Sequence, residues 1–339
     1  MSNPFPLLFL GALGAFCAVM IVVASKKLHM RIDSKIDAIR GVLPDIDCGA
    51  CGFATCSDFA KALAEGKADP AGCAPGGPKA AHAVADILGI TAQLIDPKMA
   101  VVHCKGGLKE AVERCVYDGI PDCHAATVAG YGSKVCLDGC LGLGTCVRAC
   151  PFGALSITAG RVAVVDPQKC NGCGKCLPSC PRGIIALIPR VYKIFIACSN
   201  HDFGMKVKKY CTVGCTACAE CVRTTPSGAI TIVENLPTLN YTTEENFIVA
   251  ANKCPSRCFV DLVKARPKVN IDVKCDGCGE CVKYCPVDAI RGEPGKRYVI
   301  DKDKCIGCGL CLDKCHVRAI AMWGGLGYVQ DKTGKWQKA

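Results

Sequence analysis

The sequence predicts an α+β fold in which one N-terminal transmembrane helix precedes a small four-cysteine module and a tandem series of cysteine-rich units. Three observations support this prediction. The chain contains 31 cysteines in 339 residues, far above ordinary usage. Three stretches repeat the pattern Cys-x-x-Cys-x-x-Cys-x-x-x-Cys, beginning at Cys170, Cys275 and Cys305. Near the start of the chain, residues Phe5 to Ala24 carry no charge.

The spacing of the cysteines indicates which chemistry they serve. Cysteines two residues apart, repeated in triples, cannot bridge one another without strain, which disfavours a disulfide scaffold. Zinc sites use Cys-x-x-Cys pairs about 12 to 20 residues apart rather than four thiolates in one short run. The observed spacing is instead that of bacterial [4Fe–4S] proteins, in which the fourth cysteine of each run ligates the neighbouring cluster. The tandem units are therefore predicted to be bacterial-type 2[4Fe–4S] ferredoxin-like units.

The formal net charge of +11 counts every cysteine as neutral. A [4Fe–4S] cluster with four thiolates carries a charge of about −2, so about six clusters would bring the loaded protein close to neutrality. The basic composition is therefore no evidence for a nucleic-acid partner. A local basic face could still steer an acidic electron carrier.

Residues 1–27 are predicted to form a transmembrane anchor. A helix over the uncharged stretch would span about 30 Å, the thickness of the hydrocarbon core. A cleaved signal peptide is disfavoured because no positive charge precedes the apolar run and no convincing small-residue cleavage site is present. Basic residues follow the run and place that side in the cytoplasm; they are Lys26, Lys27, His29 and Arg31. We expect a single-pass protein of the inner or plasma membrane, with its cysteine-rich part on the cytoplasmic side.

Residues 32–92 are predicted to form a four-cysteine [4Fe–4S] module. Its first three cysteines lie on a glycine-rich loop, and a helical apolar pattern from Ser57 to Glu65 separates them from the fourth. The predicted ligands are Cys48, Cys51, Cys56 and Cys73.

Residues 93–130 are predicted to be a cysteine-containing connector. Cys104 and Cys115 fit no compact ligand run. Cys123 begins a Cys-x12-Cys-x3-Cys spacing that recurs from Cys198, and both stretches stand just before ferredoxin-like runs. This spacing indicates an internal repeat and leaves open whether its first cysteine is a metal ligand.

The first ferredoxin-like unit is predicted at residues 131–190. Leu143 stands where the second cysteine of the first run is expected, so Cys136 is predicted to replace it. Alternating apolar residues around a glycine turn predict a short hairpin between the two runs. One cluster is assigned to Cys136, Cys140, Cys146 and Cys180, and the other to Cys150, Cys170, Cys173 and Cys176.

Residues 191–266 are predicted to be a degenerate ferredoxin-like unit with about one cluster. Thr225 stands where a crossing cysteine is needed, and its hydroxyl cannot replace a soft thiolate. The predicted ligands are Cys215, Cys218, Cys221 and Cys254. Cys211 remains an alternative to Cys254, and Cys258 has no assigned role.

The second intact ferredoxin-like unit is predicted at residues 267–322, followed by a tail at residues 323–339. One of its clusters is assigned to Cys275, Cys278, Cys281 and Cys315, and the other to Cys285, Cys305, Cys308 and Cys311. The whole chain is thus expected to hold about six clusters.

Three features follow one another in this chain: the uncharged N-terminal span, the stretch CGACGFATC and the stretch CLGLGTCVRACP. In this order they resemble the B subunits of the Rnf complex, the ion-translocating ferredoxin:NAD+ oxidoreductase, from Phe5 to about Pro189. The cysteine-rich extension resembles the longer, polyferredoxin-like members of that family. The resemblance implies a membrane subunit that accepts electrons from reduced soluble ferredoxin and relays them to integral membrane and flavin-bearing partner subunits.

No Gly-x-Gly-x-x-Gly follows a strand pattern in this sequence, and no phosphate loop or flavin-attachment sequence is recognised. Oxidoreductase activity and ion translocation are therefore expected to belong to an assembly, and no catalytic residue is assigned. Two other functions remain open, namely an electron-transfer subunit of another membrane redox complex and a reductive activator of corrinoid proteins. The third alternative is a storage or assembly protein for iron and sulfur.

Overall fold

The structure is a computed structural model that describes residues 5–28, 34–91, 96–225, 227–243, 245, 247–263, 266–323, 329–330 and 336–337. The chain divides into two compact parts, Met1–Ile95 and Asp96–Ala339, and each is described by itself. The basic residues His29 and Arg31 lie outside the described residues, as does most of the tail predicted at 323–339.

The N-terminal part is helical. Its elements are α1 (Phe5–Leu28), α2 (Ser34–Val42), α3 (Cys56–Ala64), the 3-10 helix η1 (Pro70–Gly72) and α4 (Gly77–Leu88). Helix α3 confirms the helical pattern predicted between the third and fourth cysteines, and its first turn is capped by Thr55, whose side chain accepts from the Asp58 amide. Ile39, Phe59 and Val84, from α2, α3 and α4, are buried together in a small apolar core.

Helix α1 covers the stretch predicted to be a transmembrane anchor. Among the described residues, no helix combines the length and the hydropathy that crossing a membrane requires.

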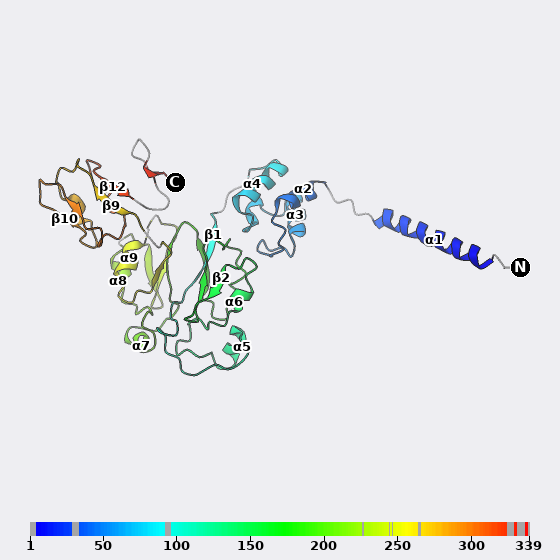
Figure 1. The fold of residues 1–339 in the computed structure, drawn as a ribbon, viewed down its shortest axis with the longest axis horizontal. Helices are drawn as coiled ribbons and strands as arrows, with labels where there is room; N and C mark the ends of the chain where they lie inside the picture. Colours follow the sequence, from blue (N-terminus) through cyan, green and yellow to red (C-terminus); the bar gives the residue numbers. More distant parts are fainter. Residues whose placement is uncertain are drawn as a thin grey trace. The chain divides into compact units, whose positions relative to one another are not determined.

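The C-terminal part consists of two-stranded antiparallel sheets and short helices joined by irregular segments (Figure 1). Three sheets pair strands that are distant in sequence: β1 (Lys98–Val102) with β4 (Ile185–Pro189), β5 (Ile194–Ile196) with β8 (Phe259–Asp261), and β9 (Lys268–Ile271) with β12 (Ile320–Trp323). Within each of these pairs lies one hairpin: β2 (Leu155–Ile157) with β3 (Ala163–Val165), β6 (Ile230–Val233) with β7 (Leu236–Leu239), and β10 (Ile290–Arg291) with β11 (Val299–Ile300). The last pair is β13 (Val329–Gln330) with β14 (Trp336–Gln337).

The short helices of this part are α5 (Cys123–Val128), α6 (Thr145–Arg148), α7 (Met205–Lys208), α8 (Glu220–Arg223), α9 (Ile248–Lys253) and α10 (Glu280–Lys283). Helices α6, α8 and α10 each carry a cysteine at their second residue and lie ahead of the hairpin of their unit. The C-terminal part thus repeats one helix–hairpin arrangement three times, in a first, a middle and a last ferredoxin-like unit.

Two expectations about the first unit can be compared with the strands. Hairpin β2–β3 confirms the predicted hairpin, with Leu155 opposite Val165. The segment expected to be a connector contributes β1, whose residues from Met99 to Val102 are buried against β4. An apolar run of this kind requires a partner strand, so the segment predicted to be a connector supplies one strand of the sheet that β4 completes.

The cores of the ferredoxin-like units are made partly of sulfur. In the first unit, Met99, Leu155 and Ile184 are buried in one cluster together with Cys146 and Cys170. Short strands and four-residue helices bury little apolar area on their own. The cysteines therefore complete the core and also form the walls of the candidate sites.

The close packing of the first unit at Gly142 can be tested by substitution. Its φ is +71°, and a Cβ added there would lie 2.2 Å from the carbonyl oxygen of Arg161, whereas Gly153, at φ +58°, has open space around it. Both alanine substitutions strain the backbone, and Gly142→Ala adds a clash that costs about 1–3 kcal/mol more. We expect thermal unfolding, followed by far-ultraviolet circular dichroism, to begin at a lower temperature in Gly142→Ala than in Gly153→Ala. Equal losses in the two variants would contradict this packing.

Candidate iron–sulfur sites

The four predicted ligands of the N-terminal module face one another. Burial raises the pKa of the Cys73 thiol, and the negative charges of Cys48, Cys51 and Cys56 raise it further. Gly76 packs directly against this sulfur, since an added Cβ would lie 3.2 Å from Cys73 Sγ. The structure therefore brings together cysteines from a loop, a helix start and the end of η1.

Three predicted sets in the first and last ferredoxin-like units also converge. Burial, followed by the charges of Cys170, Cys173 and Cys150, raises the pKa of Cys176 to about 12. The other two sets interact in the same way, namely Cys275, Cys278, Cys281 and Cys315, and Cys285, Cys305, Cys308 and Cys311. In all three sets, the fourth cysteine comes from the neighbouring run, as the crossing pattern requires.

Backbone amides at these sites point at sulfur. Ala100 donates to Cys170 Sγ at 3.3 Å, Ala154 to Cys150 Sγ at 3.4 Å, and Ala289 to Cys285 Sγ at 3.2 Å. Hydrogen bonds of this kind favour the thiolate, which is the form that ligates iron.

Glycines leave the loops room to wrap an inorganic group. Gly172 has a φ of +76°, and a Cβ there would lie 2.5 Å from the carbonyl oxygen of Lys98; at Gly307 the corresponding distance to the Pro267 oxygen is 2.4 Å. Only glycine fits a backbone that passes so near another strand. Four converging thiols, sulfur-directed amides and glycine loops together fit a [4Fe–4S] cluster.

The first unit's other set contains Cys123 where Cys136 was expected. Cys123, Cys140, Cys146 and Cys180 line one cavity. Burial, followed by the charges of Cys140, Cys123 and Cys180, raises the pKa of Cys146 to about 12. Cys136 lines a different cavity. The structure therefore places Cys123, and not Cys136, beside the other three predicted cysteines of this set.

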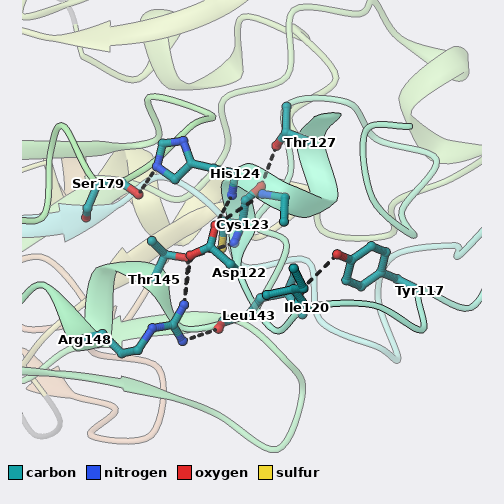
Figure 2. Close-up of polar contacts among 11 residues, drawn as sticks. Tyr117, Ile120, Asp122, Cys123, His124, Thr127, Leu143, Thr145, Arg148 and Ser179 are labelled. Atoms are coloured by element: carbon teal, nitrogen blue, oxygen red, sulfur yellow. Dashed lines mark hydrogen bonds and ion pairs between the residues drawn. The ribbon is translucent and has the colours of Figure 1, made fainter. Parts of the chain in front are cut away.

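Asp122 holds Cys123 in place (Figure 2). Its carboxylate caps α5 by accepting from the amides of His124 and Ala125, and it also accepts from Thr145 Oγ1 and from Arg148, each at 2.9 Å. The Cys123 amide donates to Thr145 Oγ1 at 2.8 Å. The hydrogen bond from Thr145, with smaller contributions from other donors, lowers the pKa of Asp122 to about 2.

The residues that hold Asp122 lie on α6, the helix that also carries Cys146. The sequence signal for Cys123 was the missing cysteine at Leu143, while the capping aspartate before it predicts only the start of α5.

The middle unit gathers its four predicted cysteines and one more. Cys215, Cys218, Cys221, Cys254 and Cys258 line a single cavity. The hydrogen bond from the Cys258 thiol lowers the pKa of Cys254 to about 6, while hydrogen bonds with Cys215 and Cys254 raise that of Cys258. The sulfurs of Cys254 and Cys258 lie 3.4 Å apart. Cys211, the alternative to Cys254, lines another cavity.

Family models match the sites just described. A model for an Fe–S cluster domain matches residues 43–75, and a model for a 4Fe-4S dicluster domain matches residues 136–184 and 274–319.

Three relatives show the family. The B subunit of the Na(+)-translocating ferredoxin:NAD(+) oxidoreductase complex of Acetobacterium woodii is 39% identical over 75% of this chain and 76% of its own length. The B subunit of an ion-translocating oxidoreductase complex of Methanosarcina acetivorans is 34% identical over 83% and 95%. The corresponding subunit of the proton-translocating complex of Clostridium ljungdahlii is 35% identical over 75% and 89%. The chain belongs to the Rnf B-subunit family.

As an Rnf B-subunit family member, the chain carries an Fe–S module and dicluster ferredoxin domains, which fit an electron-transfer role. A solved chain of a formate dehydrogenase–heterodisulfide reductase–formylmethanofuran dehydrogenase complex from Methanospirillum hungatei is 20% identical over 59% of this chain and 78% of that one, with a TM-score of 0.23. This score is too low to bear on the fold.

The position of Cys123 gives a test. Cys123→Ser removes one thiolate from a four-cysteine set, so we expect the anaerobically purified chain to lose about four iron and four sulfide per molecule. Iron and acid-labile sulfide analysis measures the loss. Cys115→Ser is the matched control, because Cys115 is exposed and its sulfur contacts only the Gly132 carbonyl among the hydrogen bonds described. If Cys123→Ser kept its full iron content, Cys123 would not be a ligand, and Cys136 would be the fourth ligand of this set.

Proposed function

We propose that this chain is the membrane-anchored electron-transfer subunit of an ion-translocating ferredoxin:NAD+ oxidoreductase complex. In this role it accepts electrons from reduced soluble ferredoxin on the cytoplasmic face and relays them to integral membrane and flavin-bearing subunits. The observation that carries the proposal is the series of four-cysteine sets in a chain of the Rnf B-subunit family. When bound, [4Fe–4S] clusters accept and release single electrons.

Six ligand sets are proposed. They are Cys48, Cys51, Cys56 and Cys73; Cys123, Cys140, Cys146 and Cys180; Cys150, Cys170, Cys173 and Cys176; Cys215, Cys218, Cys221 and Cys254; Cys275, Cys278, Cys281 and Cys315; and Cys285, Cys305, Cys308 and Cys311. Their donor chemistry and the convergence described above support these assignments.

The protein's own groups perform two tasks at these sites. Buried cysteines such as Cys281 and Cys311 exclude water, while the sulfur-directed amides stabilise thiolates. Cys218 and Cys278 are exposed, so one edge of the middle site and one edge of the last unit are open to a redox partner. Electron entry and exit at protein surfaces require edges of this kind.

The anchor is the remaining part of the proposal. Helix α1 contains 24 residues, which corresponds to a length of about 36 Å, compared with about 30 Å for the hydrocarbon core. Phe16 and Ile21 are 64% and 69% exposed, and apolar residues surround the helix rather than forming one face. Together with the uncharged sequence from Phe5 to Ala24, these features support a lipid-embedded helix.

Membrane fractionation tests the anchor. We expect the full chain in the membrane fraction, resistant to carbonate and salt washing, and a chain lacking residues 1–27 in the supernatant with its iron content unchanged. The Cys278→Ser variant is the control, since it should lose iron from the last unit and remain in the membrane. A full chain that washes off the membrane would contradict the anchor.

Reduction by ferredoxin tests the electron-transfer role. Because the exposed edges admit a partner, reduced ferredoxin should bleach the visible absorbance of the anaerobic complex within the first turnovers of a stopped-flow experiment. Dithionite provides the fully reduced reference. Rapid bleaching by dithionite with none by ferredoxin would count against the proposal, as would co-purification with a corrinoid methyltransferase in place of integral membrane subunits.

A further inference from the structure

Four cysteines outside the six sets line one further cavity of the C-terminal part. They are Cys104, Cys136, Cys198 and Cys211, here called the bridging quartet. The cavity has a volume of about 20 Å³, the same as that of the cavity lined by the Cys123 set. A cavity of the same size as a ferredoxin-type site, lined by the same number of thiols, is thus present where the sequence has no compact Cys-x-x-Cys run.

Two members of the bridging quartet occupy equivalent positions after equivalent strands. Cys104 lies two residues after β1, and Cys198 lies two residues after β5. The sulfur of Cys104 accepts a hydrogen bond from the Cys140 amide at 3.3 Å, and that of Cys198 accepts one from the Cys215 amide, also at 3.3 Å. The first and the middle unit therefore each place a cysteine sulfur at an equivalent position, with an equivalent hydrogen bond.

The other two members also correspond. Cys136 and Cys211 each lie four residues before the first ligand of their unit's run, and each sulfur packs against a glycine. A Cβ at Gly139 would lie 3.6 Å from Cys136 Sγ, and one at Gly214 would lie 3.5 Å from Cys211 Sγ. Each of the two units thus supplies two thiols to one shared cavity.

The last ferredoxin-like unit shows what the same positions hold when no quartet is formed. Ile271 lies four residues before Cys275, and Val273 lies two residues after β9. Neither position offers a metal ligand. The extra cysteines are therefore confined to the two units that share the cavity.

The sulfur atoms are too widely spaced for a single metal ion. Tetrahedral zinc holds its sulfur ligands about 2.3 Å away, which places them about 3.8 Å from one another. Among the described residues, no three members of the quartet have sulfurs within 4.8 Å of one another. The corners of an iron–sulfur cube hold thiolates farther apart than one ion does.

A buried cation faces the same cavity. Lys134 lines it, is 2% exposed, and donates from Nζ to the carbonyl oxygen of Gly106 at 2.6 Å. Within the described part of the chain, no ion pair joins this ammonium to a carboxylate. Burying an uncompensated charge costs several kcal/mol. A ligated cluster, with a charge of about −2, supplies the missing negative charge.

Asn200 provides a further polar contact to the quartet. It is 4% exposed, accepts from the Tyr210 hydroxyl at 3.0 Å, and donates from Nδ2 to Cys136 Sγ at 3.5 Å. Burial, followed by the charge of Cys104, raises the pKa of Cys136 to about 11. Its sulfur therefore depends on such donors, and on metal, to exist as a thiolate.

We propose that the bridging quartet ligates a seventh [4Fe–4S] cluster, shared between the first and the middle ferredoxin-like units. Each thiol releases its proton as its sulfur bonds to one iron, and the iron and sulfide come from the same assembly process that loads the other sites. The hydrogen bonds from Cys140 and Cys215 place this site in direct contact with one candidate site on each side. The proposal concerns cluster binding alone and does not depend on the partner complex.

The test counts clusters in the full chain. By four-iron stoichiometry, native mass spectrometry and iron and sulfide analysis of the anaerobically purified protein should give about 28 iron atoms, not about 24. Cys104→Ser and Cys198→Ser should each lose about four iron and four sulfide, and Cys115→Ser, the matched exposed control, should lose none. Because the two cysteines come from different units yet share one cluster, the double variant should also lose about four.

Three results would overturn the proposal. The first is a double variant that loses about eight iron atoms, which would mean that two neighbouring clusters were disturbed separately. The second is a pair of single variants that keep the full iron content. The third is one zinc ion per chain that disappears in Cys198→Ser. If the variants fail to accumulate, the parent chain decides, because a heaviest loaded form with six clusters rules out a seventh. Seven clusters in a chain that ferredoxin does not reduce would refute only the proposed electron donor.

Discussion

The burial of thiols in groups of four is the constraint on which the rest of the structure depends. Burial raises the pKa of Cys146 and of Cys176 to about 12, so neither is a thiolate at neutral pH unless a cation replaces its proton. Metal ligation supplies that cation and couples site formation to folding. The surrounding helices are short and the sheets are two-stranded, because ligation of several chain segments to one cluster stabilises the fold in place of extensive secondary structure.

Much of this organisation could be predicted from the sequence, since ligands of an iron–sulfur run are close along the chain. The sets built around Cys176, Cys281 and Cys311 are local apart from one crossing residue, and the structure brings each of them together. Hairpin β2–β3 and helix α3 were likewise predictable from short-range patterns. In each case the physical interaction that fixes the geometry acts within a few residues or through a known crossing rule.

Contacts that depend on tertiary structure could not be predicted in the same way. Cys123 and Cys198 have identical spacings to the cysteines that follow them, yet Cys198 corresponds in space to Cys104. The equal spacing does not reveal this match, which follows from the positions of Cys104 and Cys198 after the ends of β1 and β5. The hydrogen bond from Thr145 to Asp122 could not be predicted from short-range patterns either, because it depends on where α5 meets α6.

Each ferredoxin-like unit opens and closes on a pair of adjacent strands: β1 with β4, β5 with β8, and β9 with β12. A segment whose two ends leave side by side can be copied, inserted or lost while the chain on either side keeps its path. Such a protein can lengthen by whole cassettes during evolution. The adjacent strand pairs also explain how one unit can lose a ligand without disrupting its neighbours. In the middle unit, Thr225 stands where a ligating cysteine is expected.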